Sequence, residues 1–145
     1  NINRPLAGRF AGGRLTWLAG PSAQAGAFRL HDQLDTRVGV LKIVPGLPPK
    51  MLEAFVDAGF RAVILEGYGL GGIPDQESPM NFLPAFQYAK DHGCRLVCTT
   101  QCTYDGVDMD SYEMGVRAQQ LGVEPGGTLT TEALLCKLMI ELAEG

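Results

Sequence analysis

The sequence predicts an α/β fold, a small parallel sheet with helices on both faces, from two observations. Short apolar runs with the β-branched character of buried strands alternate along the chain with segments of helical periodicity. The clearest run, residues 62–65, leads directly into a glycine-rich loop at residues 67–72. Such a loop lies beyond the carboxyl end of its strand, where open parallel sheets bind ligands. The 145 residues, 46% hydrophobic and 19% charged, suit one packed domain.

The first 36 residues are the least domain-like part of the chain. Gly and Pro punctuate them, and only residues 14–19 have the composition of a strand. We interpret residues 1–36 as an interdomain linker with an edge strand, and residues 37–145 as the α/β domain.

From residue 37 onward, strand and helix patterns alternate. Strands are predicted at residues 38–44, 62–65 and 95–99, with a very short strand or turn at residues 123–127. A first helix follows two prolines, which suit a helix's first turn, and ends at Gly59, a suitable residue just past a helix. Its expected apolar face is Met51, Leu52, Phe55 and Val56.

Three more helices are predicted. The second begins at Asn81 as its N-cap, with Pro84 in its first turn, and ends at residues 92–93. The third spans residues 112–121 and is closed by Gly122, and Thr130 caps the fourth. The expected core residues are Phe82, Leu83, Phe86 and Ala89 in the second helix and Leu134, Leu135, Leu138, Met139 and Leu142 in the fourth.

The glycine loop satisfies G-x-G-x-x-G, the dinucleotide-binding spacing. That motif also needs a helix opening at its third glycine and an acid ending the next strand. Here Gly72 is followed by a loop composition, and the next strand candidate ends in Thr100-Gln101. We therefore interpret residues 67–72 as a glycine turn after a strand.

Composition excludes several functional classes. No apolar run is long enough to cross a bilayer, and no signal peptide pattern opens the chain. The net charge of −4, without a basic stripe, argues against a nucleic acid partner. Cys94, Cys98, Cys102 and Cys136 show neither a disulfide framework nor metal-ligand spacing. Cys94 and Cys98 at a predicted strand and Cys136 in a predicted helix indicate buried thiols in a reducing compartment. We expect a cytoplasmic protein with no cofactor and no metal.

A self-contained active site is not indicated. Thr99, Thr100 and Thr103 have no Lys or His near them in sequence, and a threonine nucleophile needs a base. The acids in the polar loop at residues 100–110 have the spacing of solvated side chains. This loop and the glycine loop leave neighbouring strands at the carboxyl edge of the sheet, where we place any site.

Several motifs, in order, resemble the C-terminal domain of L-asparaginases. They are V-G-V-L-K-I-V-P-G (38–46), V-I-L-E-G-Y-G-L-G-G-I-P (63–74), T-T-Q-C-T-Y-D-G-V-D-M-D-S-Y (99–112), the glycine at 115 and L-G-V-E-P-G-G-T-L-T-T-E-A (121–133). N-R-P-L-A (3–7) is similar to the segment that joins the family's two domains, with Arg4 in place of a proline. The likeness is greatest to the cytoplasmic bacterial type and to the related archaeal amidotransferase subunit.

The resemblance implies a domain of a larger enzyme that converts asparagine to aspartate and ammonia. In that family the nucleophile domain precedes this one, and the active site lies between it and the C-terminal domain of a neighbouring subunit. No nucleophile motif occurs here, so we expect the isolated chain to be inactive. The resemblance also implies that the full protein is a homo-oligomer, a dimer or tetramer. The ligand-binding or interface candidates are Glu66, Tyr68, Gly69, Thr100, Gln101, Cys102 and Tyr112.

One departure from the family concerns regulation. The allosteric bacterial enzymes bind asparagine as an effector, and the resemblance implies that Thr100 and Cys102 occupy effector-site positions. Those enzymes carry an arginine where this chain has Glu66. A glutamate cannot hold a carboxylate as an arginine fork does. We therefore expect a structural Glu66, bonded to backbone N–H groups of its own glycine loop, and no asparagine activation.

Two alternatives remain open. The chain could be a regulatory module whose loops hold a small effector, or part of the amidohydrolase subunit of a tRNA-dependent amidotransferase.

Overall fold

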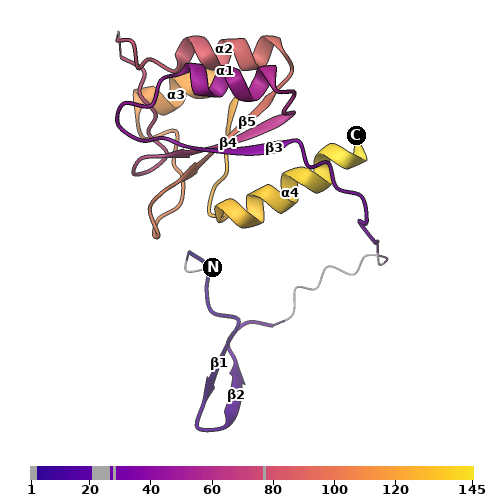
Figure 1. Cartoon of the computed structure of the whole chain (residues 1–145). Helices are drawn as coiled ribbons and strands as arrows, with labels where there is room; N and C mark the ends of the chain where they lie inside the picture. Colours follow the sequence, from indigo (N-terminus) through magenta and orange to yellow (C-terminus); the bar gives the residue numbers. More distant parts are fainter. Residues whose placement is uncertain (1–2, 21–26, 28, 77) are drawn as a thin grey trace.

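The protein has the predicted α/β architecture, here as a computed structural model that describes residues 3–20, 27, 29–76 and 78–145. Its four-stranded parallel sheet has the order β3-β4-β5-β6 (Figure 1). The strands are β3 (Val38–Lys42), β4 (Ala62–Gly67), β5 (Arg95–Thr100) and β6 (Val123–Pro125). Parallel pairing places Lys42 beside Glu66, Gly67 beside Thr100 and Cys98 beside Pro125. The loops after all four strands therefore leave the same edge.

Helices cover both faces of this sheet (Figure 1). The helices α1 (Lys50–Asp57), α2 (Leu83–Asp91) and α3 (Glu113–Gln120) pack on one face, and α4 (Thr131–Glu144) packs on the other. On β4, Val63 and Leu65 point to the first face and Ala62 and Ile64 to the second, all with no exposed surface. Burial on both faces explains why this strand is apolar throughout rather than alternating.

The helix ends lie at the predicted capping residues, except that one helix begins one residue later than predicted. Gly59 has a φ of 85° and its N–H donates to the Val56 carbonyl, and the Thr130 hydroxyl accepts from the Ala133 N–H. The second helix begins at Leu83, one residue later than Asn81 as N-cap would require. The Asn81 side chain accepts the Leu83 N–H at 2.9 Å, so it caps from one position further out.

The predicted apolar face of α1 is wrong at one residue. Leu52 is fully buried and Phe55 and Val56 are half-buried, but Met51 is 43% exposed. Leu52 points towards the sheet, and Met51, about 100° around the helix from it, points to solvent.

Residues 8–17 form a separate β-hairpin, not one strand at the sheet edge. The strands β1 (Gly8–Ala11) and β2 (Arg14–Trp17) pair antiparallel with each other. Gly12 and Gly13 both have positive φ, 56° and 74°, as a two-residue type I′ turn requires. Gly-Gly between two short runs was the sequence signal for this hairpin.

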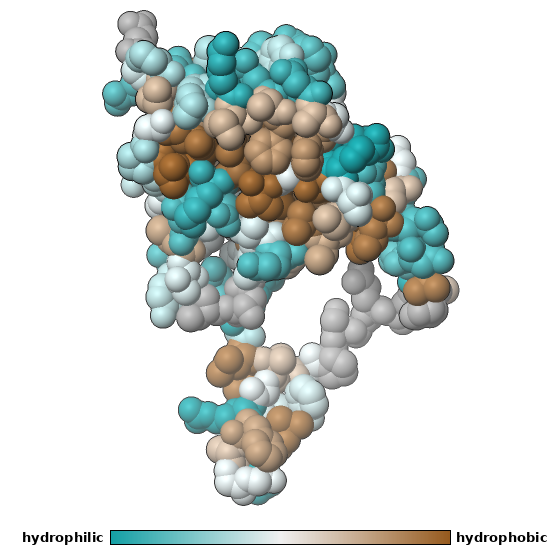
Figure 2. All heavy atoms as spheres, viewed as in Figure 1, coloured by the Kyte–Doolittle hydropathy of each residue, from teal (hydrophilic) through white to brown (hydrophobic). Residues whose placement is uncertain are grey.

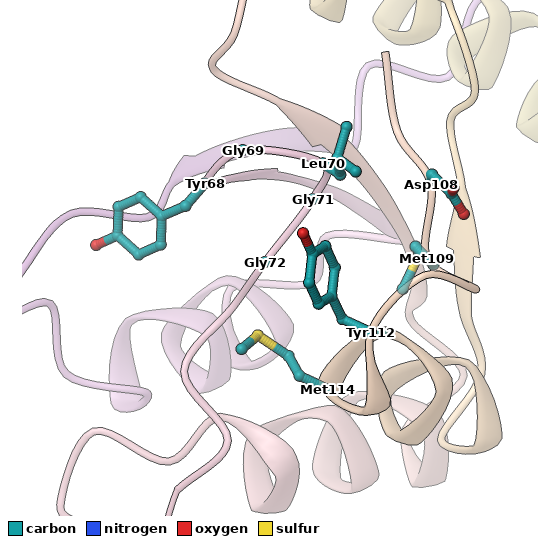
Figure 3. A pocket seen from close by; sticks show the side chains of 10 residues that line it. Tyr68, Gly69, Leu70, Gly71, Gly72, Asp108, Met109, Tyr112 and Met114 are labelled. Atoms are coloured by element: carbon teal, nitrogen blue, oxygen red, sulfur yellow. The ribbon is translucent and has the colours of Figure 1, made fainter. Parts of the chain in front are cut away.

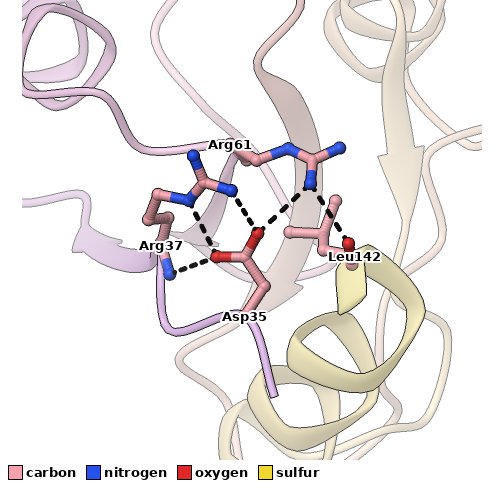
Figure 4. A network of polar contacts seen from close by, with 4 residues as sticks. All are labelled: Asp35, Arg37, Arg61 and Leu142. Carbon is pink, nitrogen blue, oxygen red and sulfur yellow. Dashed lines mark hydrogen bonds and ion pairs between the residues drawn. The ribbon is translucent and has the colours of Figure 1, made fainter. Parts of the chain in front are cut away.

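The chain enters the domain through an ion-paired junction at Asp35 (Figure 4). The Arg37 guanidinium makes two hydrogen bonds to this carboxylate, at 3.0 and 2.7 Å, and Arg61 donates to it and to the Leu142 carbonyl. The hydrogen bonds from Arg37 hold the pKa of the Asp35 carboxyl well below its usual range. The Asp35 N–H donates to the Met139 carbonyl, which fixes the chain to the C-terminal half of α4.

Within the described residues, none of the helices has the length and apolarity needed to cross a membrane.

Candidate functional site

The glycine loop after β4 folds back on itself at the carboxyl edge of the sheet. The Tyr68 N–H donates to the Gly72 carbonyl at 2.8 Å, and the Gly72 N–H donates to the Tyr68 carbonyl at 2.7 Å. A side chain at Gly67 would lie 2.8 Å from the Gly71 and Gly72 backbone. The turn is therefore possible only with glycine at this position.

No helix opens at the end of this loop. The next helix, α2, begins at Leu83, eleven residues after Gly72. Without a helix N-terminus at the third glycine, residues 67–72 lack the pyrophosphate-binding geometry of a dinucleotide fold. The interpretation as a glycine turn is confirmed.

The buried thiol of Cys98 packs against this turn and binds its backbone. The Cys98 Sγ donates to the Gly71 carbonyl at 3.3 Å, and a Cβ on Gly71 would lie 3.1 Å from that sulfur. Burial raises the pKa of Cys98 to about 12. The thiol is therefore a protonated structural donor and not a nucleophile.

The loop after β5 packs beside the glycine turn. The Asp108 N–H donates to the Leu70 carbonyl at 3.0 Å, and the Asp108 carboxylate accepts from the Ser111 hydroxyl and backbone. These hydrogen bonds lower the pKa of the Asp108 carboxyl. At the start of α3, a Cβ on Gly115 would lie 2.2 Å from the Met109 carbonyl, so only glycine permits this approach.

The two loops enclose a cavity of about 320 Å³ (Figure 3). Figure 3 shows the Tyr112 ring standing beside Met114, with its hydroxyl towards the glycine loop, while the Tyr68 ring points away on the other side. The side chain of Tyr112 is highly exposed, at 62%, and Met114 is held by the Ile73 N–H donating to its sulfur. The cavity is lined by Tyr68, Gly69, Leu70, Gly71, Gly72, Asp108, Met109, Tyr112, Met114 and Gly115.

A second, more polar hollow of about 330 Å³ lies between the end of β5 and the start of α4. Thr100 and Cys102 line it together with Thr131 and Glu132. The Thr100 hydroxyl accepts from the Cys102 N–H at 3.0 Å and donates to the Gly69 carbonyl. It therefore faces an amide and a carbonyl rather than a base.

Glu66 is held by side chains and not by its own glycine loop. Its carboxylate accepts from the Thr131 hydroxyl at 2.6 Å and lies 3.6 Å from the Lys42 ammonium. The glutamate therefore joins the end of β4 to the start of α4.

Gln101 lies in neither cavity. Its Nε2 donates to the Ile43 carbonyl at 2.6 Å and the Glu66 carbonyl at 2.9 Å, and its N–H donates to the Gly67 carbonyl. This half-buried side chain fastens the carboxyl ends of β3 and β4 together.

The sequence candidates thus divide into three places. Tyr68, Gly69 and Tyr112 line the first cavity, Thr100 and Cys102 line the polar hollow, and Glu66 and Gln101 are structural links. Sequence reasoning missed Met109 and Met114, whose apolar character gave no signal of a cavity. It also missed Thr131, although the run T-L-T-T at 128–131 follows a strand at the same edge.

The cysteines and acids do not form a metal site in the described part of the chain, where no group of three or more His, Cys, Asp or Glu side chains gathers. All four cysteines are free thiols. Cys94 and Cys98 are buried as expected, whereas Cys102 and Cys136 are exposed. Cys136 lies on the solvent side of α4, away from Leu134 and Leu138.

Comparison with known proteins links this chain to one family. The model of the glutaminase/asparaginase C-terminal domain matches residues 37–145. The L-asparaginase of Thermococcus kodakarensis is 43% identical over 108 residues, which are 74% of this chain and 31% of that protein. A glutamyl-tRNA(Gln) amidotransferase subunit of Methanopyrus kandleri is 36% identical over 108 residues, 74% of this chain and 22% of that protein.

Two solved structures are similar along almost the whole chain. The thermostable L-asparaginase from Thermococcus kodakarensis superposes with a TM-score of 0.89 at 36% identity, covering 99% of this chain and 42% of that one. L-asparaginase I from Vibrio cholerae superposes with a TM-score of 0.85 at 26% identity, covering 99% and 43%. The chain therefore spans less than half the length of these relatives.

Proposed function

The chain belongs to the glutaminase/asparaginase C-terminal domain family, and we propose that it is the C-terminal part of an L-asparagine amidohydrolase. The reaction converts asparagine to aspartate and ammonia. This domain completes the active site of a neighbouring subunit and supports assembly of a cytoplasmic homo-oligomer, a dimer or tetramer.

One observation carries the proposal: the first cavity has the Tyr112 ring in its lining, but no Ser, Thr, Cys or Lys that could serve as a nucleophile. The exposed Tyr112 stands at its mouth, while the Thr100 hydroxyl is bonded to backbone groups and Thr99 is 2% exposed. A cavity whose lining offers binding surface but no such nucleophile supports the role of one half of a shared site. Large aromatic side chains with a polar tip suit such an interface.

The experiment is a pair of ammonia-release assays on asparagine. We expect the full-length protein to release ammonia and the 145-residue chain to release none. Release from the short chain that is abolished by Thr100→Ala or Thr103→Ala would contradict the proposal. A full-length protein without activity towards asparagine or glutamine would contradict it as well.

A second candidate is the amidohydrolase subunit of a tRNA-dependent amidotransferase. It is favoured by the 36% identity with the Methanopyrus kandleri amidotransferase subunit. The parts that would distinguish the two lie outside this chain. Ammonia release from asparagine at full rate without charged tRNA supports the asparaginase, whereas release that requires charged tRNA and a partner subunit supports the amidotransferase.

The polar hollow raises the alternative of an effector site. Glu132 lines it, and Glu66 lies behind Thr131, whose hydroxyl it binds; the bonds of Glu66 to Thr131 and Lys42 support a structural role. We expect a hyperbolic velocity curve for asparagine, because a like charge repels an amino-acid carboxylate. Sigmoidal kinetics that Cys102→Ala or Thr100→Ala removes would show that the hollow binds an effector.

A further inference from the structure

The tip of the loop after β5, residues 103–105, is held by a side chain from the other end of the chain. The Asn3 Oδ1 accepts from the Asp105 N–H at 3.1 Å, and the Asn3 Nδ2 donates to the Thr103 carbonyl at 3.4 Å. The side-chain amide thus binds a carbonyl and an N–H two residues apart, as a residue of a neighbouring parallel strand does. Within the described residues, these are the only hydrogen bonds that the tip makes.

The same tip contains an unfavourable backbone conformation. Asp105 has a φ of 74°, and it is the only residue other than glycine with a positive φ in the described part of the chain. The next residue, Gly106, also has a positive φ, of 70°. A residue with a side chain keeps this conformation when its surroundings hold it there, and Asn3 binds the N–H of Asp105 itself. The Asn3 side chain therefore stabilises the bend in the loop.

The bend directs the loop towards the first cavity. Gly106 is packed so closely that a Cβ on it would lie 2.7 Å from the Gly127 carbonyl. The next two N–H groups, those of Val107 and Asp108, donate to carbonyls of the domain at 2.9 and 3.0 Å. Asp108 lines the first cavity. Because the backbone has no room to move at Gly106, a change in the bend is transmitted to these two hydrogen bonds.

Asn3 belongs to the segment that precedes the α/β domain. Asn3, Arg4 and Pro5 line one hollow together with residues 125–129, and Asn3 also lines the polar hollow. Figure 2 shows the β1–β2 hairpin that follows, with hydrophobic residues along it, apart from the body of the domain. Residues 3–5 therefore join this segment to the edge of the sheet where both cavities lie.

We propose that Asn3 is a positioning residue for the reaction of the proposed function. By holding residues 103–105 it fixes the bend of the loop, and with it the part of the first cavity that the loop contributes. Asn3 lies outside the lining of that cavity, so it acts through the loop and not on a substrate. This inference rests on the proposed function, in which the first cavity is one half of a shared site.

The first measurement is amide hydrogen exchange in the full-length protein, followed by mass spectrometry with fragmentation to single residues. Asn3→Ala is expected to raise the exchange rate of the Asp105 N–H about fivefold, the effect of losing one neutral hydrogen bond, and to raise that of Val107 as well. Gln33→Ala is the matched control. It removes an amide side chain from the same segment, where that amide donates to the neighbouring aspartate at 3.5 Å, and should leave both rates unchanged.

Two substitutions at Asp105 separate the bend from the carboxylate, because both remove the carboxylate. Asp105→Val places a β-branched residue at a φ of 74°, which such residues strongly disfavour. It is expected to raise the exchange rate of the Val107 N–H, as Asn3→Ala does. Asp105→Gly accepts the positive φ and is expected to keep the parental exchange rate at Val107.

The second measurement is the kinetics of ammonia release from asparagine by the same variants. The lining of the first cavity offers no Ser, Thr, Cys or Lys, so its part in a shared site is binding. We expect Asn3→Ala and Asp105→Val to raise KM about threefold or more at parental kcat, since binding that is equal in the ground and transition states affects KM alone. Asp105→Gly and Gln33→Ala should keep both constants. A merely structural contact would change stability and leave KM unchanged.

Three results would overturn the proposal: a parental exchange rate at Asp105 in Asn3→Ala, faster exchange in that variant with a parental KM, or the same rise in KM for Asp105→Gly as for Asp105→Val. If the full-length protein releases no ammonia from asparagine or glutamine, the proposed function fails. The exchange rates then decide by themselves whether Asn3 holds the loop, so the two failures are distinguishable.

Discussion

The Gln101 side chain offers the sharpest test of how the sheet edge is held. Its Nε2 donates to two carbonyls, at 2.6 and 2.9 Å, where β3 and β4 end. A neutral hydrogen bond contributes about 1 kcal/mol, so Gln101→Met is expected to lower the free energy of unfolding by about 2 kcal/mol. Gln101→Glu also turns a carboxylate towards two carbonyl oxygens. Its expected loss is about 3 kcal/mol at pH 7.

The assay is urea denaturation of the 145-residue chain. At pH 4 the Gln101→Glu loss should fall to that of Gln101→Met or below it, because protonation gives the carboxyl group one donor, which methionine lacks. Gln87→Met is the control: Gln87 Nε2 also makes a short hydrogen bond, 2.7 Å to Asp91, but on the exposed surface of α2. Its expected effect is below about 0.5 kcal/mol. The reasoning is refuted if Gln101→Met matches Gln87→Met, or if Gln101→Glu loses nothing at neutral pH.

Three further predictions concern pH, thiol reactivity and the cavity. The pKa of Asp35 is lowered by folding, so the stability it contributes is present above about pH 4 and is lost as the pH falls towards the folded value. Thermal midpoints of the parent and Asp35→Asn should therefore converge below pH 4, and a constant difference would count against the ion pair. A thiol reagent at pH 8 should modify Cys102 in the native protein and Cys98 only in denaturant, because Cys98 is buried and burial raises its pKa to about 12. The modification rate of each cysteine is measured by peptide mass spectrometry, and equal rates for Cys98 and Cys102 in the native protein would disprove this. In the full-length protein, Tyr112→Ala should lower kcat/KM for asparagine about tenfold or more, and Tyr112→Phe should lower it less. If both variants keep the kinetics and the assembly of the parent, Tyr112 has a purely structural role.

The fold was predictable because its strongest signals are local. Residues 62–65 are apolar without alternation, as expected for a strand buried on both faces. Gly59 marks the end of a helix because it adopts a positive φ, and Thr130 marks the start of one because its hydroxyl accepts a hydrogen bond from the first turn. The hairpin at residues 8–17 was missed for a different reason. Its strands are four residues long and exposed, so the only signal was the Gly-Gly turn between them.

The candidate site was predictable in place but not in detail. Parallel strands bring their carboxyl ends to one edge, so the order of strands and loops along the sequence is enough to locate Tyr68, Thr100 and Tyr112 there. The division of these residues between two cavities depends on contacts between distant segments, such as Glu66 with Thr131. Pairing over 65 residues of sequence leaves no periodic pattern, and so a single sequence does not reveal it.

The placement of α4 has a consequence for synthesis on the ribosome. Among the described residues, α4 and Leu129 just before it cover the face of the sheet formed by Val38, Ile64 and Val97, yet this helix follows all the described strands. Until residues 131–144 have left the exit tunnel, a nascent chain with a paired sheet exposes that apolar face to its neighbours on the polysome. Stop codons placed before α4 should therefore produce aggregates rather than a shorter folded domain, and chaperones that bind nascent apolar segments should engage this chain until α4 emerges.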